Sequence, residues 1–315
     1  MKKITKILFT ILLMLCACAF TSCFYGESSG LDFELNSSKN SYSVIGIGVC
    51  SDRYISIPNE YKGLPVTAIA DHAFEGLNII GVKFSDNIEV IGNYAFSNCA
   101  NLKTLEFSNA GNLKTIGNYA FYFPSFWLWD VKIPEGVKTI GDHAFDLAWP
   151  INLSIPNSLE DVGIGAFVGM NGAQGSYKAY YFDFLTPYQT YGGAVYLGND
   201  TNPYLLLCSL QNKNALRCQI NSKTKIIGAG AFYNCKNLDN LTIPFFVHSI
   251  GEQAFNGCSS LKTIVIPENV IKIGAAAFYK CDSLSIYCYA NSKLSEWHTD
   301  WNYSNCPVVW GYKGK

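Results

Sequence analysis

Residues 250–267 read IGEQAFNGCSSLKTIVIP, and this stretch decides the fold because its pattern returns along the chain. The pattern is Ile-Gly, two variable residues, Ala-Phe, often Cys three residues later, then Leu and an apolar pair before Pro. A unit of about 23 residues cannot bury its own apolar face and must stack on copies of itself. We therefore predict a solenoid. The phenylalanines of the pattern are Phe74, Phe96, Phe121, Phe145, Phe167, Phe232, Phe255 and Phe278, in steps of 22, 25, 24, 22, 65, 23 and 23 residues.

The clearest unit, Val247 to Asn269, has the leucine-rich-repeat spacing at Leu261, Ile264 and Ile266. This spacing predicts a short parallel strand that points alternate residues into the core and ends at Pro267, because proline cannot donate to a strand ladder. The Ala-Phe pair is expected on a short helical or turn segment that faces the strand. The expected fold class is therefore an α/β repeat: a leucine-rich-repeat solenoid of short parallel strands and short helical or turn segments.

Three stretches carry a resemblance to a known family: IGNYAFSNCANLKTLEF, IGAGAFYNCKNLDNLTIP and IGEQAFNGCSSLKTIVIP. They are similar to the BspA-like, or treponemal-type, leucine-rich repeat, and the resemblance covers about residues 42–312. It implies a bacterial surface or secreted protein, of a kind in which several members serve in adhesion to host proteins or to other cells.

The domain boundaries follow from where the period holds. One leucine-rich-repeat domain is expected at residues 42–312, with repeats at about 66–170 and 224–289 and an insertion at about 171–223. Within the insertion, YGGAVYLGNDTNPYLLL predicts a β-hairpin with Asn199 to Pro203 as its turn. Caps are expected at Tyr42 to Ile69 and at about 290–312, where Trp297, Trp301 and Trp310 stand, because an open solenoid exposes apolar surface and strand edges.

The N-terminus has the form of a lipoprotein signal peptide at residues 1–22, with basic Lys2, Lys3 and Lys6 before an apolar run from Ile7 to Phe20. Cys23 is the preferred lipid-attachment residue, and Cys18 is the alternative. Residues 23–41 are expected to form a tether. A lipid on Cys23 would place the exported protein at a membrane or the cell surface. A simple secretory signal with incidental cysteines remains open.

Composition and cysteine positions restrict the chemistry. The chain is 49% hydrophobic with a net charge of -1, and loss of Lys2, Lys3 and Lys6 leaves 20 basic against 24 acidic residues, which argues against a nucleic-acid partner. Cys99, Cys235, Cys258 and Cys281 share one repeat position and are expected to be buried thiols. No metal site or cofactor is predicted. Cys208 with Cys218 and Cys288 with Cys306 are left open as disulfides.

Histidines do not predict an enzyme. His72 and His143 occupy one repeat position, where Tyr94 and Tyr119 stand in other coils, so they are expected to be structural. His248 and His298 lie outside any recognisable nucleophile motif.

The candidate binding residues are the solvent-facing strand residues, which adjacent coils bring side by side at about 4.8 Å. Trp129 is the strongest candidate, because exposed tryptophans are enriched at the centre of interfaces, although local packing would also explain it. The predicted site residues are Lys103, Glu106, Trp129, Asp130, Lys132, Asn152, Asp239 and Asn240.

The expected function is that of a cell-surface protein that binds an extracellular or cell-surface protein, as in adhesion. A repeated, near-neutral surface with aromatic residues suits a macromolecule better than a small substrate. Carbohydrate binding is the alternative, since tryptophan and tyrosine faces stack on sugars. A structural or antigenic surface protein without a specific ligand is the third possibility.

Overall fold

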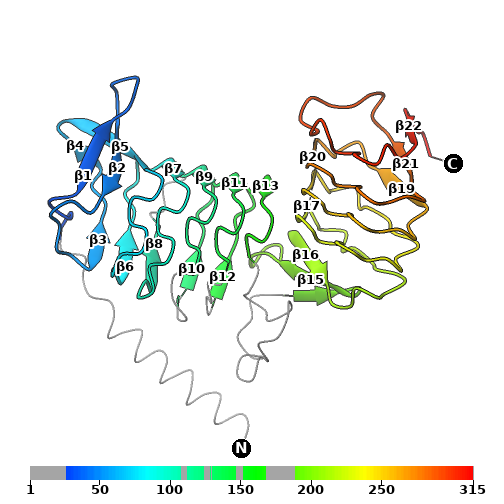
Figure 1. Ribbon diagram of the computed structural model, residues 1–315, viewed down its shortest axis with the longest axis horizontal. Coiled ribbons are helices and arrows are strands. Elements are labelled where there is room, and N and C mark those ends of the chain that lie inside the picture. The colour runs from blue at the N-terminus through cyan, green and yellow to red at the C-terminus, as the bar shows by residue number, and fades with distance from the viewer. Residues whose placement is uncertain are drawn as a thin grey trace, which may run out of the picture.

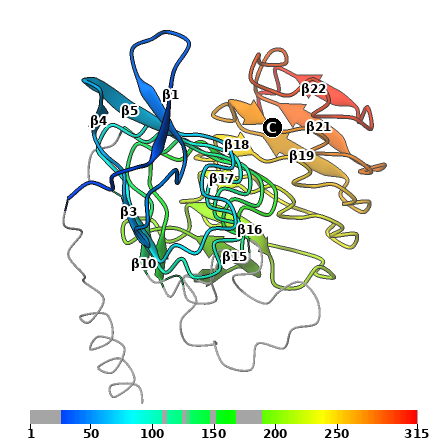
Figure 2. The same cartoon turned by 60° about the vertical axis from the view of Figure 1, so that its left-hand side comes forward.

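The computed structural model describes residues 26–107, 112–123, 128, 130–146, 152–167 and 189–314. They form two stacks of coils, named here the first arc (residues 26–167) and the second arc (residues 189–314). Figure 1 shows the first arc in blue to green and the second arc in yellow-green to red, with β15 and β16 at the yellow-green end of the second arc. Figure 2 shows the end strands β1 and β22 on opposite stacks.

Most described coils contribute two short strands, which stack into two parallel rows. Row A is made by the strand after the conserved Leu, and row B by the strand before the conserved Gly. Row A consists of β3 (Tyr54–Ser56), β6 (Gly81–Lys83), β8 (Thr104–Glu106), β10 (Asp130–Lys132) and β12 (Asn152–Ser154), then β19 (Thr263–Ile266), β21 (Ser285–Cys288) and β22 (Val308–Trp310). Row B consists of β5 (Leu64–Ile69), β7 (Val90–Ile91), β9 (Thr115–Ile116), β11 (Thr139–Ile140) and β13 (Asp161–Val162), then β16 (Leu206–Leu210), β17 (Ile226–Ile227), β18 (Ser249–Ile250) and β20 (Lys272–Ile273). The remaining strands are β1 (Asp32–Leu35), β2 (Tyr42–Gly46), β4 (Glu60–Tyr61), β14 (Gln189–Tyr191) and β15 (Ala194–Leu197).

The expected leucine-rich-repeat solenoid of parallel strands is present, but the expected helical segments are wrong. No helix occurs among the residues that the structure describes, and the Ala-Phe segments are successive turns. The reason is a left-handed residue just before Ala-Phe, such as His72 (φ 61°) or Tyr94 (φ 56°), which a right-handed helix cannot contain. The fold is therefore a β-solenoid and not an α/β repeat.

The hydrogen bonds between coils run in two opposite directions. In the turn segments the N–H groups donate to the next coil, as from Phe74 to the Ala95 carbonyl (2.8 Å). In row B they donate to the preceding coil, as from Gly92 to the Ile69 carbonyl (2.9 Å). Because these bonds link coils, the turn segments satisfy their backbone without helical bonds.

The conserved glycine after row B lets successive coils approach closely. A Cβ on Gly251 would lie 2.4 Å from the backbone nitrogen of Ala229 in the preceding coil, and a Cβ on Gly274 would meet the nitrogen of Glu252 at the same distance. Atoms do not pack that closely, so a side chain here would push the coils apart. This explains the Ile-Gly signature of the repeat.

The core of each arc is a column of phenylalanine rings. Phe96 is fully buried and stacks on Phe74 and Phe121, with ring centroids 5.1 and 5.3 Å apart. In the second arc, Phe255 stacks between Phe232 (5.0 Å) and Phe278 (5.3 Å). Such offset rings add attraction beyond the burial of their surface.

The predicted hairpin is confirmed: β15 and β16 are antiparallel, and Asn199 to Pro203 lies between them. Its position is central and not peripheral. Leu197 and Leu206 belong to the core of the first arc, whereas Tyr196 and Leu207 belong to that of the second. The hairpin is thus a wall shared by two cores.

Both ends are covered. At the first end, β1 pairs antiparallel with β2, so the described fold begins within the segment expected to be a tether, and Phe33 stacks on Tyr61 at 4.0 Å. At the other end, Trp301 lies edge-on to Phe278 at 5.8 Å, and Trp297 is buried. These aromatic caps shield the first coil of the first arc and the last coil of the second arc from water.

Candidate binding surfaces

Row A of the first arc is a flat, charged strip. Lys83 lies opposite Glu106 across β6 and β8, and Lys132 lies opposite Ser154 across β10 and β12. Lys83, Glu106 and Lys132 are all exposed. Partial burial raises the pKa of Glu106, while Lys83 lowers it. The strip therefore presents charges of alternating sign on adjacent strands.

The structure brings together some of the predicted site residues and separates others. Glu106 on β8, Asp130 and Lys132 on β10, and Asn152 on β12 lie on neighbouring strands, since β8 lies next to β10. Lys103 directly precedes β8 and is half-buried. Trp129 lies outside the described residues, as do Cys23 and Cys18. Asp239 and Asn240 belong to the second arc, beyond the hairpin wall, so the eight residues do not form one surface.

Asp239 lies instead in a shallow hollow of 430 Å³ on the second arc. The hollow crosses successive coils at the turn before row A, and Leu216 on its wall is 63% exposed. Its other wall residues are small or polar. They are Asn237, Ser259, Ser260, Lys262 and Ser283. The hollow therefore offers hydrogen-bonding groups, one carboxylate (Asp239) and one ammonium group (Lys262).

Two adjacent phenylalanines project from the turn between row A and row B of the second arc. Phe245 is 55% and Phe246 is 62% exposed, and their rings contact each other edge-on at 5.6 Å. The Val247 N–H donates to the Pro244 carbonyl and closes this turn. Sequence analysis missed this pair, although its signal is visible: the same two turn positions are polar in the next coil, where they are Glu268 and Asn269.

The turn segments of the first arc carry a ladder of stacked rings. His72, Tyr94, Tyr119 and His143 follow one another with ring centroids 4.9, 4.8 and 4.9 Å apart. This placement is the repetition that the sequence predicted for the two histidines. Each histidine also contacts a carboxylate three residues later: His72 Nδ1 lies 2.5 Å from Glu75, and His143 Nδ1 lies 2.9 Å from Asp146.

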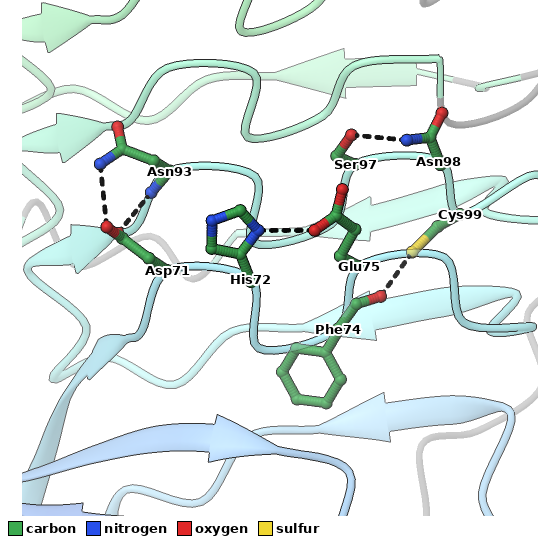
Figure 3. A network of polar contacts seen from close by, with 8 residues as sticks. All are labelled: Asp71, His72, Phe74, Glu75, Asn93, Ser97, Asn98 and Cys99. Carbon is green, nitrogen blue, oxygen red and sulfur yellow. Dashed lines mark hydrogen bonds and ion pairs between the residues drawn. The ribbon is translucent and has the colours of Figure 1, made fainter.

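Figure 3 shows the polar network at the start of this ladder, drawn from two successive coils. His72 points toward Glu75, and the carboxylate of Asp71 accepts hydrogen bonds from the backbone and side-chain nitrogens of Asn93 (2.7 and 3.1 Å). These contacts hold one coil on the next. His72 contacts Glu75 within its own coil and stacks on Tyr94 of the next coil, so its contacts are structural.

The repeat cysteines are free thiols that bond to the preceding coil. The Cys99 thiol donates to the Phe74 carbonyl at 3.0 Å, as Figure 3 shows, and Cys281 donates likewise to Phe255 at 3.0 Å. Burial raises the pKa of both thiols to about 12, which disfavours the reactive thiolate. The structure has Cys208, Cys218, Cys288 and Cys306 as free thiols as well.

Metal clusters and membrane-spanning helices are both absent from the described part of the chain. No group of His, Cys, Asp and Glu side chains there has the arrangement of a metal site. No helical segment there has the length and apolar character of a membrane span.

Comparison with known proteins gives a family match over most of the chain. The family model described as "BspA type Leucine rich repeat region" matches six copies, at residues 67–174 and 208–306. The match is to a repeat family, and no enzyme family is indicated. No curated protein matches the chain.

Several solved bacterial leucine-rich-repeat structures are similar. One from T. pallidum is 18% identical with a TM-score of 0.43, over 82% of this chain and 90% of that chain. One from Bacteroides ovatus is 18% identical with a TM-score of 0.44, over 91% and 77%. A leucine-rich cell surface protein of Faecalibacterium prausnitzii is 20% identical with a TM-score of 0.34, over 92% and 98%.

Proposed function

The chain belongs to the BspA-type leucine-rich repeat family, and on this premise we propose that it is a cell-surface protein that binds another protein, as in adhesion to a host or to a neighbouring cell. The observation that carries the proposal is the strip of row A in the first arc. Lys83, Glu106 and Lys132 stand exposed on adjacent strands. Flat surfaces of this kind suit macromolecular partners.

The binding residues proposed on this strip are Lys103, Glu106, Asp130, Lys132 and Asn152, together with Trp129. They include charges of both signs, which favours a partner with a complementary pattern and disfavours partners of uniform charge. Asp239 and Asn240 are proposed as a separate contact on the second arc, at the hollow beside Leu216.

Anchoring is proposed through a lipid on Cys23, with Cys18 as the alternative. The basic residues and the apolar run before these cysteines support a lipoprotein signal at residues 1–22. Mass spectrometry of the purified chain would show an N-terminal cysteine that carries a diglyceride and an amide-linked acyl chain. Cys23→Ala should abolish this lipid modification while Cys18→Ala should not, and the reverse result would assign Cys18.

The binding proposal is tested with the full chain in detergent against extracellular-matrix proteins, whole cells and a glycan array. The test variant exchanges two charges of the strip, Glu106→Lys with Lys132→Glu. The control variant exchanges an exposed ion pair just before the row B strands β11 and β13, Lys138→Glu with Glu160→Lys, whose side chains are 2.9 Å apart.

Saturable protein binding that falls in the strip variant and stays in the control supports the proposal. Binding to glycans alone would favour a carbohydrate-binding function, for which aromatic side chains supply stacking faces. Absence of any saturable ligand would leave a structural or antigenic surface protein.

A further inference from the structure

The two arcs carry opposite net charges. Residues 26–167 contain 16 acidic and 8 basic side chains, a net charge of -8, whereas residues 189–314 contain 7 acidic and 10 basic side chains, a net charge of +3. Charge that is divided in this way between two halves of one rigid surface attracts the unlike halves of two copies and repels the like halves.

The basic arc also bears an apolar pair that the fold does not require. Among the described residues, six turns between row A and row B are closed by the same backbone hydrogen bond, and in five of them both central residues are polar or glycine. Those five pairs are Asp86–Asn87, Glu135–Gly136, Asn157–Ser158, Ser222–Lys223 and Glu268–Asn269. In the sixth turn the pair is Phe245–Phe246, more than half exposed. Since the turn forms equally well with polar residues, the rings do not serve the turn.

The next coil holds the Phe245–Phe246 turn in place through a hydrogen bond. Asn269 donates from its side chain to the Phe245 carbonyl at 2.9 Å, so the turn rests on the Glu268–Asn269 turn below it. The corresponding turn on the other side carries Lys223, which is exposed. A partner therefore meets two aromatic rings beside a basic side chain, on an arc of positive charge.

The acidic arc offers a face that complements these features. The turn segments of the first arc carry Asp71, Glu75, Asp142 and Asp146 beside the ring ladder of His72, Tyr94, Tyr119 and His143, and their stretches contain no Lys or Arg. Lysines such as Lys132 in row A and Lys138 just before row B lie elsewhere on this arc, so the turn segments are its most uniformly acidic face.

The aromatic rings of the ladder, like the Phe245–Phe246 pair, are not required for the turn to form. The equivalent left-handed positions of the second arc are Gly230, Gln253 and Ala276 (φ 62°, 52° and 49°), so the turn forms without an aromatic ring. Aromatic rings at left-handed positions are uncommon and strained. Their exposed edges beside carboxylates fit an aromatic and basic partner surface.

We propose that this chain associates with a second copy of itself, with the Phe245–Phe246 turn of one copy docked on the acidic ring ladder of the first arc of the other. The contact is heterologous, because a surface of one arc meets a different surface of the other arc. Further copies add through the surfaces that a first contact leaves free. Self-association of this kind would multiply the binding strips presented at a surface.

The test measures the protein mass of the full chain in detergent by light scattering combined with absorbance and refractive index. The chain is compared over a wide concentration range at about 0.01 M and about 1 M salt, where electrostatic screening lengths are about 30 Å and about 3 Å. The key variant is Phe245→Glu with Phe246→Asn, which copies the turn of the next coil. Thermal melting checks that it folds. The matched control is Glu268→Gln, which changes the neighbouring turn and keeps the hydrogen bond from Asn269 to the Phe245 carbonyl.

A mass that rises with concentration at low salt, falls at high salt, and requires about tenfold or more higher concentration in the Phe245→Glu, Phe246→Asn variant supports the proposal. Glu75→Gln should weaken association as well, because it removes one charge from the receiving face. A monomer at every concentration overturns the proposal, as does association that the phenylalanine variant leaves unchanged. Binding of the phenylalanine turn to phosphatidylcholine–phosphatidylglycerol vesicles, with the chain itself monomeric, would overturn it in favour of a membrane contact. No foreign ligand is present, so failure here is separate from failure of the proposed function.

Discussion

Lys272 on β20 and Asp161 on β13 are separated by 111 residues, yet the Lys272 Nζ lies 2.6 Å from Asp161 Oδ2. This ion pair joins row B of the second arc to row B of the first. Its side chains are 40% and 30% exposed, so water and salt weaken it. It is a surface link between two arcs whose main connection is the buried hairpin wall.

The first prediction concerns this link. Urea unfolding of the original chain, Lys272→Ala, Asp161→Ala and the double variant should give a coupling free energy of about 0.2–1 kcal/mol, the usual range for exposed pairs. The coupling should vanish at about 1 M salt, where screening is strong. A coupling of zero at low salt would mean that the two side chains do not meet in solution.

A second prediction concerns the hairpin wall. Leu206→Ala and Leu207→Ala should each lower the free energy of unfolding by about 2–5 kcal/mol, because each leaves a cavity in a packed core. Since the two residues lie on one strand but in the cores of different arcs, both variants should shift one common transition. The measurement is urea unfolding followed by tryptophan fluorescence and by circular dichroism, with Ser209→Ala as the control. Two separate transitions would show that the arcs unfold independently.

Close stacking of coils gives a third prediction. Gly251→Ala should destabilise the chain by about 1–3 kcal/mol, the usual penalty of overpacking, because its Cβ would meet the backbone of Ala229 and neither coil can yield alone. The midpoint of thermal unfolding measures this loss, and Ser259→Ala in an exposed turn is the reference variant. An unchanged midpoint would contradict the spacing described here.

A fourth prediction follows from the buried thiols. The pKa of Cys281 is raised by burial from 9.0 to about 12, so the unfolded chain loses this proton at a lower pH than the folded chain. Stability is therefore unaffected below about pH 8 and falls as the pH rises above 9, by up to about 1.4 kcal/mol per pH unit for one such thiol. In reductant, the stability difference between the original chain and Cys281→Ala should shrink with rising pH. A constant difference would refute the assignment.

The sequence predicted the core far better than the connecting segments. A step of about 23 residues aligns Phe232, Phe255 and Phe278, and stacking of identical units then requires their burial. The prediction of helical segments was wrong because the residue types of Tyr94 and His72 do not indicate a left-handed backbone. Their hydrogen bonds also go to other coils, which local sequence does not encode.

The candidate site was predictable only in part. Alternation along the strand placed Glu106 and Lys132 on the exposed face, because strand side chains point to opposite sides in turn. The separation of Asp239 from them was not predictable, since the hairpin wall sets how the second arc meets the first. The same wall brings Lys272 to Asp161. The exposure of Phe245 and Phe246 was predictable from the sequence, because they are two apolar residues at turn positions that are polar in the next coil.

The opposed directions of the coil-to-coil hydrogen bonds have an electrical consequence. The turn-segment N–H groups donate to the next coil and those after row B to the preceding coil, so their peptide dipoles oppose one another in part, where those of an α-helix would add. The stack therefore lacks the full dipole alignment of an α-helix, and the net charge of each arc comes from its side chains.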